Sequence, residues 1–446
     1  MEIPAKSICA RLPYACRDSG QTRIMERFMK VLFRGFIASI GVIAFCAMAS
    51  LPAANAAEQS DLSSSPDTIT LTDFQAASTV IGQPNFSSAS PNQGMGATPA
   101  ADTIAGPYGA AAVSSGGVLY VSDYSNQRVL GFDSVPSSND ASAGFVLGQP
   151  NLTSSGKGTA ANEFGGPQSV VLYKSKMIVA DFYNNRVMIW KNVPTSTQVP
   201  ADTVVGQSGF GNRVSTCTQA GMSAPETATV GGAKLIVPDS SNSRVLIFNK
   251  IPTKNGAKAN IVLGQPNFTS CTENQGGAPS AKNVGYPSAA WSDGKRLVVV
   301  DSDDNRVMIW TKFPTKNFQP ANIVLGQPNL TSGVVNNNGS GSSGSPSAKN
   351  LSYPYDGVFS NGTQLFVVDQ GNNRVLIWNH FPTTSFTAAD DVLGQTNMAC
   401  GVENNDGSGC TEGSPSANNL DHPTGVFHFK NNLIVTDGGN NRYLIY

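Results

Sequence analysis

Residues 365–378 read LFVVDQGNNRVLIW, which is an apolar run, a short polar stretch and a second apolar run. The polar stretch between Asp369 and Arg374 has the length of a hairpin connection. In the second run, RVLIW, Val375 and Ile377 would face one side of a strand, and Leu376 and Trp378 would face the other. Both faces of this strand would therefore be apolar. A strand that is apolar on both faces is covered on both faces, so this stretch predicts antiparallel sheets stacked face to face.

The same phrase recurs through the chain, which indicates a repeat architecture. Its other copies are SDYSNQRVLGF, ADFYNNRVMIW, PDSSNSRVLIF, VDSDDNRVMIW and TDGGNNRYLIY, with aspartates 58 to 68 residues apart. A second phrase, VLGQPN or a close variant, also occurs six times. The chain has 45 Gly, 27 Pro and only 13% charged residues, which excludes coiled coils, helical solenoids and multi-span membrane proteins.

The phase of the repeat predicts how the fold closes. Each repeat carries four strand signals: one starting at a proline, one before the aspartate, one after the arginine and one at Val-Leu-Gly-Gln. The first signal, at 79–83, is a fourth strand, and the last, at 442–446, is a third strand. The N-terminal strand can therefore complete the last sheet and leave no open edge. We expect an all-β, six-bladed β-propeller of four-stranded antiparallel blades over residues 79–446.

The Asp-x-x-x-Asn-Arg-Val phrase after a Leu-x-Val-x strand resembles the NHL-repeat family of six-bladed propellers. The resemblance covers about 370 of the 446 residues. It implies a module that binds ligands or partners, with an amidating lyase and sugar-lactone or ester hydrolases as enzyme relatives of the fold. The resemblance predicts the architecture specifically but says very little about the function.

The N-terminal region has the pattern of an export signal. Lys30 and Arg34 precede an apolar stretch at about 35–51, and Ala54-Asn55-Ala56 supplies the small residues of a cleavage site. A transmembrane anchor is the alternative, but the stretch is short and is followed by Pro52. We expect 1–56 to be a cleaved leader, translation to start at Met1 or Met29, and 57–78 to be a linker.

The mature protein is expected to be periplasmic or extracellular and mildly acidic. A chain starting at residue 57 has a net formal charge of about −5. This charge balance indicates no excess of basic residues that would bind nucleic acid. No stable membrane insertion is expected after the leader is cleaved. Four cysteines remain, which favours two disulfides in an oxidising compartment. Three pairings are possible, of which we favour Cys400–Cys410 and Cys217–Cys271.

The repeated charged residues are expected to be structural. An aspartate at a hairpin can accept N–H groups of the turn, and an arginine can brace loop carbonyls or that carboxylate. Six-fold repetition distributes such groups around a ring instead of gathering them at one site. The residues are Asp123, Asp181, Asp239, Asp301, Asp369, Asp437, Arg128, Arg186, Arg244, Arg306, Arg374 and Arg442.

Departures from the repeat in the first, channel-lining strands carry the candidate functional residues. Glu226 and Asp356 offer carboxylates that could hold Ca²⁺, a hard cation that prefers oxygen ligands. Gln168, Tyr355 and His422 could add ligand contacts at the mouth of the central channel. A polar, water-filled channel without an ion is the alternative. The chain has three histidines, too few in suitable places for the zinc site of the lyase relative.

These observations predict a binding or scaffold module for a protein, glycan or small-molecule partner, with no cofactor other than possible Ca²⁺. The competing hypothesis is a Ca²⁺-dependent hydrolase or lyase with its site at the channel mouth. A structural or self-association role, carried by the long loops after each fourth strand, is a third reading. Runs such as 336–347 in those loops could be binding surface or unordered spacers.

Overall fold

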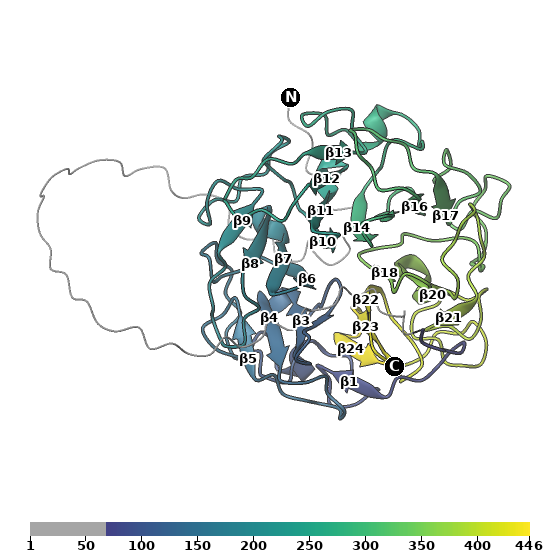
Figure 1. Ribbon diagram of the computed structural model, residues 1–446. Helices are drawn as coiled ribbons and strands as arrows, with labels where there is room; N and C mark the ends of the chain where they lie inside the picture. Colours follow the sequence, from purple (N-terminus) through teal and green to yellow (C-terminus); the bar gives the residue numbers. More distant parts are fainter. Residues whose placement is uncertain (1–67) are drawn as a thin grey trace, which may run out of the picture. The chain divides into compact units, whose positions relative to one another are not determined.

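The computed structural model describes residues 68–446, which form six four-stranded antiparallel sheets arranged around a central axis (Figure 1). This confirms the predicted six-bladed β-propeller. The expected leader, 1–56, and residues 57–67 lie outside the described residues. No α-helix occurs within 68–446, and no helix there is long and apolar enough to cross a membrane.

Each blade is numbered by its place along the chain. Blade one contains β2 (Ala112–Val113), β3 (Leu119–Asp123), β4 (Arg128–Phe132) and β5 (Phe145–Leu147). Blade two contains β6 (Pro167–Tyr173), β7 (Lys176–Asp181), β8 (Arg186–Trp190) and β9 (Thr203–Val205). Blade three contains β10 (Thr229–Gly231), β11 (Lys234–Asp239), β12 (Arg244–Phe248) and β13 (Ile261–Leu263).

The remaining blades follow the same order. Blade four contains β14 (Pro287–Ser292), β15 (Leu297–Asp301), β16 (Arg306–Trp310) and β17 (Ile323–Leu325). Blade five contains β18 (Val358–Ser360), β19 (Leu365–Asp369), β20 (Arg374–Trp378) and β21 (Asp391–Leu393). Blade six contains β22 (Pro423–Phe429), β23 (Asn432–Asp437), β24 (Arg442–Ile445) and β1 (Thr79–Ile81).

The second and third strands of each blade pair in a fixed register. In blade five, Asp369 lies opposite Arg374 and Leu365 lies opposite Trp378. The polar residues between these strands form a single 3₁₀ turn, 370–372, that ends at Asn373 in the left-handed conformation, with φ 52°. All five residues of β20 are buried, because neighbouring blades cover both faces of the sheet.

The N-terminal strand closes the ring as predicted. Strand β1 pairs antiparallel with β24, and Val80 lies opposite Leu444. Six buried apolar clusters fill the six interfaces between neighbouring blades. The cluster between blades six and one joins Ile81 and Ile445 to Leu119 and Val121, so the two ends of the described chain share one core.

Residues just before β1, which the sequence suggested as linker, lie against the propeller. Ile69 and Leu71 are buried in the cluster between blades five and six. The N–H of Ile69 donates to Oε1 of Gln364 at 2.9 Å, and the N–H of Phe74 donates to the carbonyl of Val392 at 3.1 Å. This segment is therefore part of the folded ring from Ile69 onward.

The connections divide the ring into two faces. The mouth face holds the 3₁₀ turns after the second strands, the starts of the first strands and the long loops that follow each fourth strand. The basal face holds the turns from first to second strands and the loops from third to fourth strands. The repeated aspartates and arginines and the candidate channel residues belong to the mouth face.

Candidate functional site

A buried aspartate–arginine pair connects each blade to the long loops of the mouth face. In blade five, Nε of Arg374 donates to Oδ2 of Asp369 at 2.7 Å. Its other nitrogens donate to the carbonyls of Met398, Ser347 and Asn350 at 2.6 to 3.1 Å. One guanidinium therefore joins two loops to the end of a strand, and all six blades have this pair.

The same aspartates also fix the start of each first strand. Oδ1 of Asp369 accepts the N–H of Ser352 at 2.7 Å, and Oδ2 accepts Nδ2 of Asn372 at 2.7 Å. Burial raises the pKa of Asp369 although the Arg374 guanidinium opposes that shift. Since donors surround every pair and the pairs lie in six separate blades, the arrangement organises loops and does not form one reactive centre.

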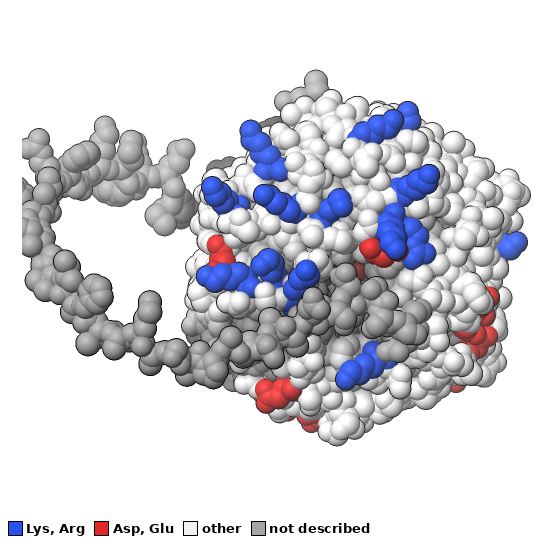
Figure 2. Space-filling view, in the orientation of Figure 1, with Lys and Arg blue, Asp and Glu red and all other residues white. Residues whose placement is uncertain are grey.

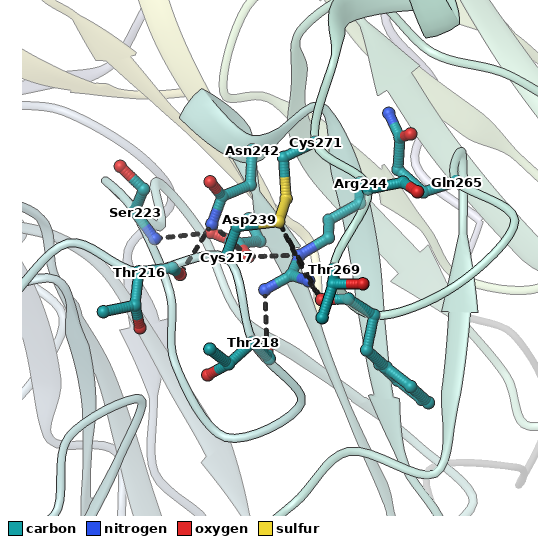
Figure 3. The surroundings of a disulfide bond; sticks show 12 residues. Thr216, Cys217, Thr218, Ser223, Asp239, Asn242, Arg244, Gln265, Thr269 and Cys271 are labelled. Carbon is teal, nitrogen blue, oxygen red and sulfur yellow. Dashed lines mark hydrogen bonds and ion pairs between the residues drawn. A yellow bond between two sulfur atoms is a disulfide. The ribbon is translucent and has the colours of Figure 1, made fainter.

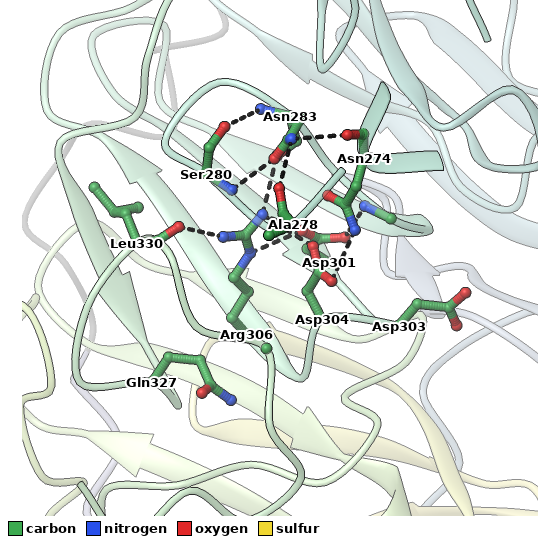
Figure 4. Close-up of polar contacts among 12 residues, drawn as sticks. Asn274, Ala278, Ser280, Asn283, Asp301, Asp303, Asp304, Arg306, Gln327 and Leu330 are labelled. Atoms are coloured by element: carbon green, nitrogen blue, oxygen red, sulfur yellow. Dashed lines mark hydrogen bonds and ion pairs between the residues drawn. The ribbon is translucent and has the colours of Figure 1, made fainter. Parts of the chain in front are cut away.

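Blade four departs from this pattern at one position. Five blades place an asparagine three residues after the aspartate, whereas blade four has Asp304. Oδ2 of Asp304 pairs with Nη2 of Arg306 at 3.0 Å, and Oδ1 accepts Nδ2 of Asn274 at 3.0 Å (Figure 4). Burial, followed by the nearby Asp301 carboxylate, raises the pKa of Asp304 to about 8. The guanidinium of Arg306 therefore forms ion pairs with both Asp301 and Asp304.

Both favoured disulfides are present. Cys217 and Cys271 join the loops before and after blade three, with Cα atoms 6.3 Å apart. The bond lies beside the Asp239–Arg244 pair, and Thr218 next to it accepts a hydrogen bond from Arg244 (Figure 3). Cys400 and Cys410 close a short loop before blade six, with Cα atoms 5.0 Å apart. Two disulfides fit an oxidising compartment.

The mouth of the central channel contains the two acidic residues that the sequence singled out. Glu226 precedes β10 and Asp356 precedes β18, so they come from blades three and five. Both are buried, with 0% and 2% of their surface exposed. The two carboxyl groups are electrostatic neighbours, because the charge of Glu226 helps to raise the pKa of Asp356. The fold therefore unites residues that are 130 positions apart.

Two tyrosines donate to the same oxygen of Glu226. The hydroxyl of Tyr286 lies 2.5 Å from Oε1, and that of Tyr355 lies 2.6 Å from it. Within residues 68–446, no donor hydrogen-bonds to Oε2 of Glu226 or to either carboxylate oxygen of Asp356. Three carboxylate oxygens at one buried position thus lack the donors that buried oxygens normally have.

Burial sets the protonation of this pair. It raises the pKa of Glu226 to about 7, against the hydrogen bonds from the two tyrosines. It also raises the pKa of Asp356 well above its ordinary value, and the Glu226 charge adds to this shift. Because two adjacent buried carboxylates cannot both ionise cheaply, the pair either shares a proton or is neutralised by a cation.

A layer of tyrosine rings surrounds the acid pair. Tyr353 and Tyr355 stack with ring centroids 5.4 Å apart, and Tyr108 meets Tyr355 edge-on at 6.3 Å. Tyr124 continues the layer, with its ring 4.8 Å from that of Tyr108. Tyr355 is buried, whereas Tyr108, Tyr124 and Tyr353 are only partly covered. These rings offer aromatic contact area next to Tyr355, the ring that hydrogen-bonds to Glu226.

The other candidate residues occupy different surroundings. Gln168 is buried in blade two, and its Oε1 also has no hydrogen-bond partner in the described chain. His422 belongs to a separate group: its Nδ1 lies 2.5 Å from Oδ1 of Asp421 and 3.9 Å from Oε1 of Glu403. The hydrogen bond with Asp421 raises the pKa of His422. Exposed acidic groups of this kind are common and do not by themselves make a metal site.

The sequence analysis did not identify Tyr286 or Tyr353 as neighbours of the acid pair. One signal could have done so. The residue before each first-strand proline is Gly106, Gly166 or Ala224 in blades one to three, but Tyr286, Tyr353 or His422 in blades four to six. Of the large residues, Tyr286 contacts Glu226 directly and Tyr353 stacks on Tyr355, whereas His422 belongs to the separate group with Asp421.

The residues present fit a hard cation in part. Ca²⁺ takes six to eight oxygen ligands, and the Glu226–Asp356 pair offers three carboxylate oxygens without donors. The remaining ligands would have to come from water, the substrate or backbone carbonyls. Without a cation, the same pair can act as a shared-proton acid and base, or it can accept hydrogen bonds from a ligand.

Comparisons with known proteins identify no family. No family model matches the chain, and no curated protein matches it. Among solved structures, it is similar to virginiamycin B lyase from Staphylococcus aureus, at 13% identity over 78% of this chain and 86% of that one, with a TM-score of 0.38.

Two further solved structures are similar to the chain at the same low level. A streptogramin B lyase structure matches at 13% identity over 77% of this chain and 93% of that one, with a TM-score of 0.35. A structural-genomics protein of unknown function from Bacteroides thetaiotaomicron matches at 11% over 83% and 75%, with a TM-score of 0.43. At these identities no activity transfers to the chain.

Proposed function

We propose that the protein is an exported, NHL-like binding module whose ligand site is the mouth of the central channel. The observation that carries this proposal is the Glu226–Asp356 pair, buried and with three carboxylate oxygens that lack donors. The six aspartate–arginine pairs are satisfied by loop and turn groups, so they leave no capacity for a ligand. The acid pair departs from the six-fold repetition, and its carboxylate oxygens can still accept hydrogen bonds from a ligand.

The site favours a small ligand, or an exposed group of a partner, that carries hydrogen-bond donors. Tyr108, Tyr124 and Tyr353 give partly covered aromatic surface beside the acid pair. Tyrosine supplies contact area at low conformational cost and can stack on a sugar or other ring. Because Tyr355 covers Glu226, a ligand that reaches the carboxyl groups must displace this ring or its hydroxyl.

A thermal-shift screen tests this proposal. A panel of monosaccharides, oligosaccharides, amino acids and organic amines is applied to the wild type, to Glu226→Gln and to a control, Glu412→Gln, in an exposed loop. We expect compounds that stabilise the wild type and the control but not Glu226→Gln. Compounds that stabilise all three proteins equally would place the binding site elsewhere and overturn the proposal.

A Ca²⁺-dependent hydrolase or lyase is the second candidate function, favoured by the same donor-free oxygens. A bound Ca²⁺ would supply Lewis-acid polarisation of a substrate oxygen. Glu226 and Asp356 would hold it, and the hydroxyls of Tyr286 and Tyr355 would orient Glu226. The chain's own groups could then bind substrate and hold a proton at the mouth.

Metal analysis separates the two candidates. Equilibrium dialysis against ⁴⁵Ca²⁺ at pH 8 is combined with thermal melts with and without EDTA. About one Ca²⁺ per chain, lost in Asp356→Asn together with EDTA-sensitive stability, would support the metal-dependent reading. A protein that takes up no Ca²⁺ and melts identically in EDTA would exclude that reading and leave the binding module.

A further inference from the structure

The basal face separates positive from negative charge around the ring. The turns and loops of blades two to four on this face contain nine Lys and Arg and two Asp, and Lys176 and Lys234 begin the strands that follow two of these turns. The corresponding connections of blades one, five and six contain one Lys and three Asp. Figure 2 shows such a face, with blue atoms gathered over the blades formed by β6–β9, β10–β13 and β14–β17. The near-zero net charge of the chain conceals this asymmetry.

The cations nearest the strand ends define what we call the basal arc. They follow third strands or lie at first-to-second turns, and therefore share one end of the sheets. They are Lys174, Lys176, Lys191, Lys234, Lys250, Lys295, Arg296 and Lys312.

Most of the arc has no acidic partner. Lys191 pairs with Asp202 at 3.0 Å, and Arg296 pairs with Asp293 at 2.8 Å. The other six members form no ion pair with any residue of 68–446. Like charges held on one face repel one another, and an external anion relieves that repulsion.

Aromatic rings hold several of these cations at the surface. Lys174 lies over Tyr173 at 5.6 Å, and Lys234 lies over Phe313 at 5.0 Å. Arg296 lies over Phe381 at 3.8 Å. Each cation is thereby kept near the protein surface with its charge still accessible.

The face offers nothing to insert into a hydrophobic phase. The exposed large hydrophobic residues in the described chain are Met95, Tyr183, Val214 and Val335, all on mouth-face loops or turns. The cations spread over an area of three blades instead of following one line (Figure 2). A broad set of cations on one face without an apolar wedge matches a planar array of anions better than a single phosphate or one linear polymer.

We propose that the basal arc docks the propeller peripherally on an anionic phospholipid surface, through lipid phosphate headgroups. Each lysine or arginine near such a surface adds a modest, salt-sensitive attraction. Several acting together hold a protein on the bilayer without insertion. In this orientation the mouth face, with its acid pair and tyrosines, points away from the membrane.

Vesicle co-sedimentation of the mature, exported protein tests this proposal, with its N-terminus verified by mass spectrometry. The probes are vesicles of phosphatidylcholine alone and of phosphatidylcholine with phosphatidylglycerol in equal parts. The arc variant is Lys174→Gln/Lys234→Gln/Lys295→Gln. The matched control is Lys157→Gln/Lys282→Gln/Lys349→Gln, which removes the same charge from the long loops that follow fourth strands. Each control lysine also lies over an aromatic ring.

We expect binding to the anionic vesicles at 50 mM salt, weakened roughly 10- to 100-fold in the arc variant and less than about 3-fold in the control. Raising the salt to 0.5 M should abolish it. Equal loss in both triple variants, equal binding to neutral vesicles, or binding only to a soluble polyanion such as heparin would each overturn the proposal. Unchanged melting of the arc variant confirms that it is folded.

Discussion

The hydroxyl of Tyr355, at the start of blade five, donates a 2.6 Å hydrogen bond to Oε1 of Glu226, at the start of blade three. Tyr286 of blade four donates to the same oxygen, so three consecutive blades converge on one carboxyl group. The second oxygen of Glu226 has no donor among residues 68–446, and the Glu226 charge helps to raise the pKa of the neighbouring Asp356. The residues around Glu226 therefore form a polar site that the repeated residues of the blades do not form.

The acid pair should make stability fall as the pH rises. A carboxyl group whose pKa is raised by folding stabilises the protein fully below its unfolded pKa, and this contribution is lost as the pH rises through the folded value. For Glu226 the interval runs from its ordinary pKa of 4.5 to a folded pKa of about 7. The double variant Glu226→Gln/Asp356→Asn should lose less stability between pH 5 and pH 8 than the wild type, by on the order of 3 kcal/mol.

Urea unfolding at the two pH values measures this difference. Glu412→Gln, an exposed carboxyl, is the control and should follow the wild type. A double variant with the wild-type pH dependence would show that the pair is already neutralised by other groups.

The aspartate–arginine pairs should be among the most sensitive positions in the chain. Arg374→Lys keeps the charge but cannot reach Asp369 and three carbonyls at once. We expect a loss of about 3–5 kcal/mol in the free energy of unfolding, the cost of a broken buried pair. Arg296→Lys, at a partly exposed pair, should cost less than about 1 kcal/mol. Similar losses in both variants would contradict the bracing role of Arg374.

Asp304 and Asp301 should respond in opposite directions to the same change. Asp304→Asn restores the asparagine that the other blades carry and removes a carboxyl group whose pKa is raised to about 8. Its stabilising effect should grow as the pH rises from 4 to 8, to on the order of 2 kcal/mol. Asp301→Asn removes the main partner of Arg306 and should destabilise. Thermal melts of both variants across this pH range measure the two effects. Destabilisation by Asp304→Asn would refute the prediction.

The two disulfides should differ in their contributions. Cys217 and Cys271 are 54 residues apart, whereas Cys400 and Cys410 are 10 apart. Constraint of the unfolded chain predicts about 4 kcal/mol for the longer loop and about 3 kcal/mol for the shorter one. Paired Cys→Ser variants in denaturant titrations give both values. A larger loss for the Cys400–Cys410 variant would mean that local structure in its loop outweighs chain entropy.

Removal of the closing strand should open the ring. A chain that begins at Gly82 lacks β1 and exposes the edge of β24, together with the apolar cluster around Ile445. We expect association or loss of cooperative unfolding, because an unpaired apolar edge binds other strands. Size-exclusion chromatography with light scattering compares it with a chain that begins at residue 57. A monomeric truncated protein with an unchanged melting temperature would show that β1 is dispensable.

The sequence by itself determined the six blades, their four-stranded composition and the closure of the ring. These features follow from local rules, since the apolar alternation, the hairpin residues and the phase of the repeat are readable along the chain. The sequence favoured the two disulfide pairs but left three pairings open, and the structure decided between them. Each aspartate–arginine pair spans only five residues and recurs in register, as in Asp369 and Arg374.

Only the tertiary structure decided which departures from the repeat meet. Glu226 and Asp356 were both visible as acidic exceptions, but they are 130 residues apart in the chain, and only the ring brings the starts of blades three and five to one channel mouth. The run 336–347 read equally well as an unordered spacer, yet Asn337 is buried and donates to Gln327. The basal arc was hidden for the same reason: composition sums charge over the chain, whereas a folded ring sorts it by face.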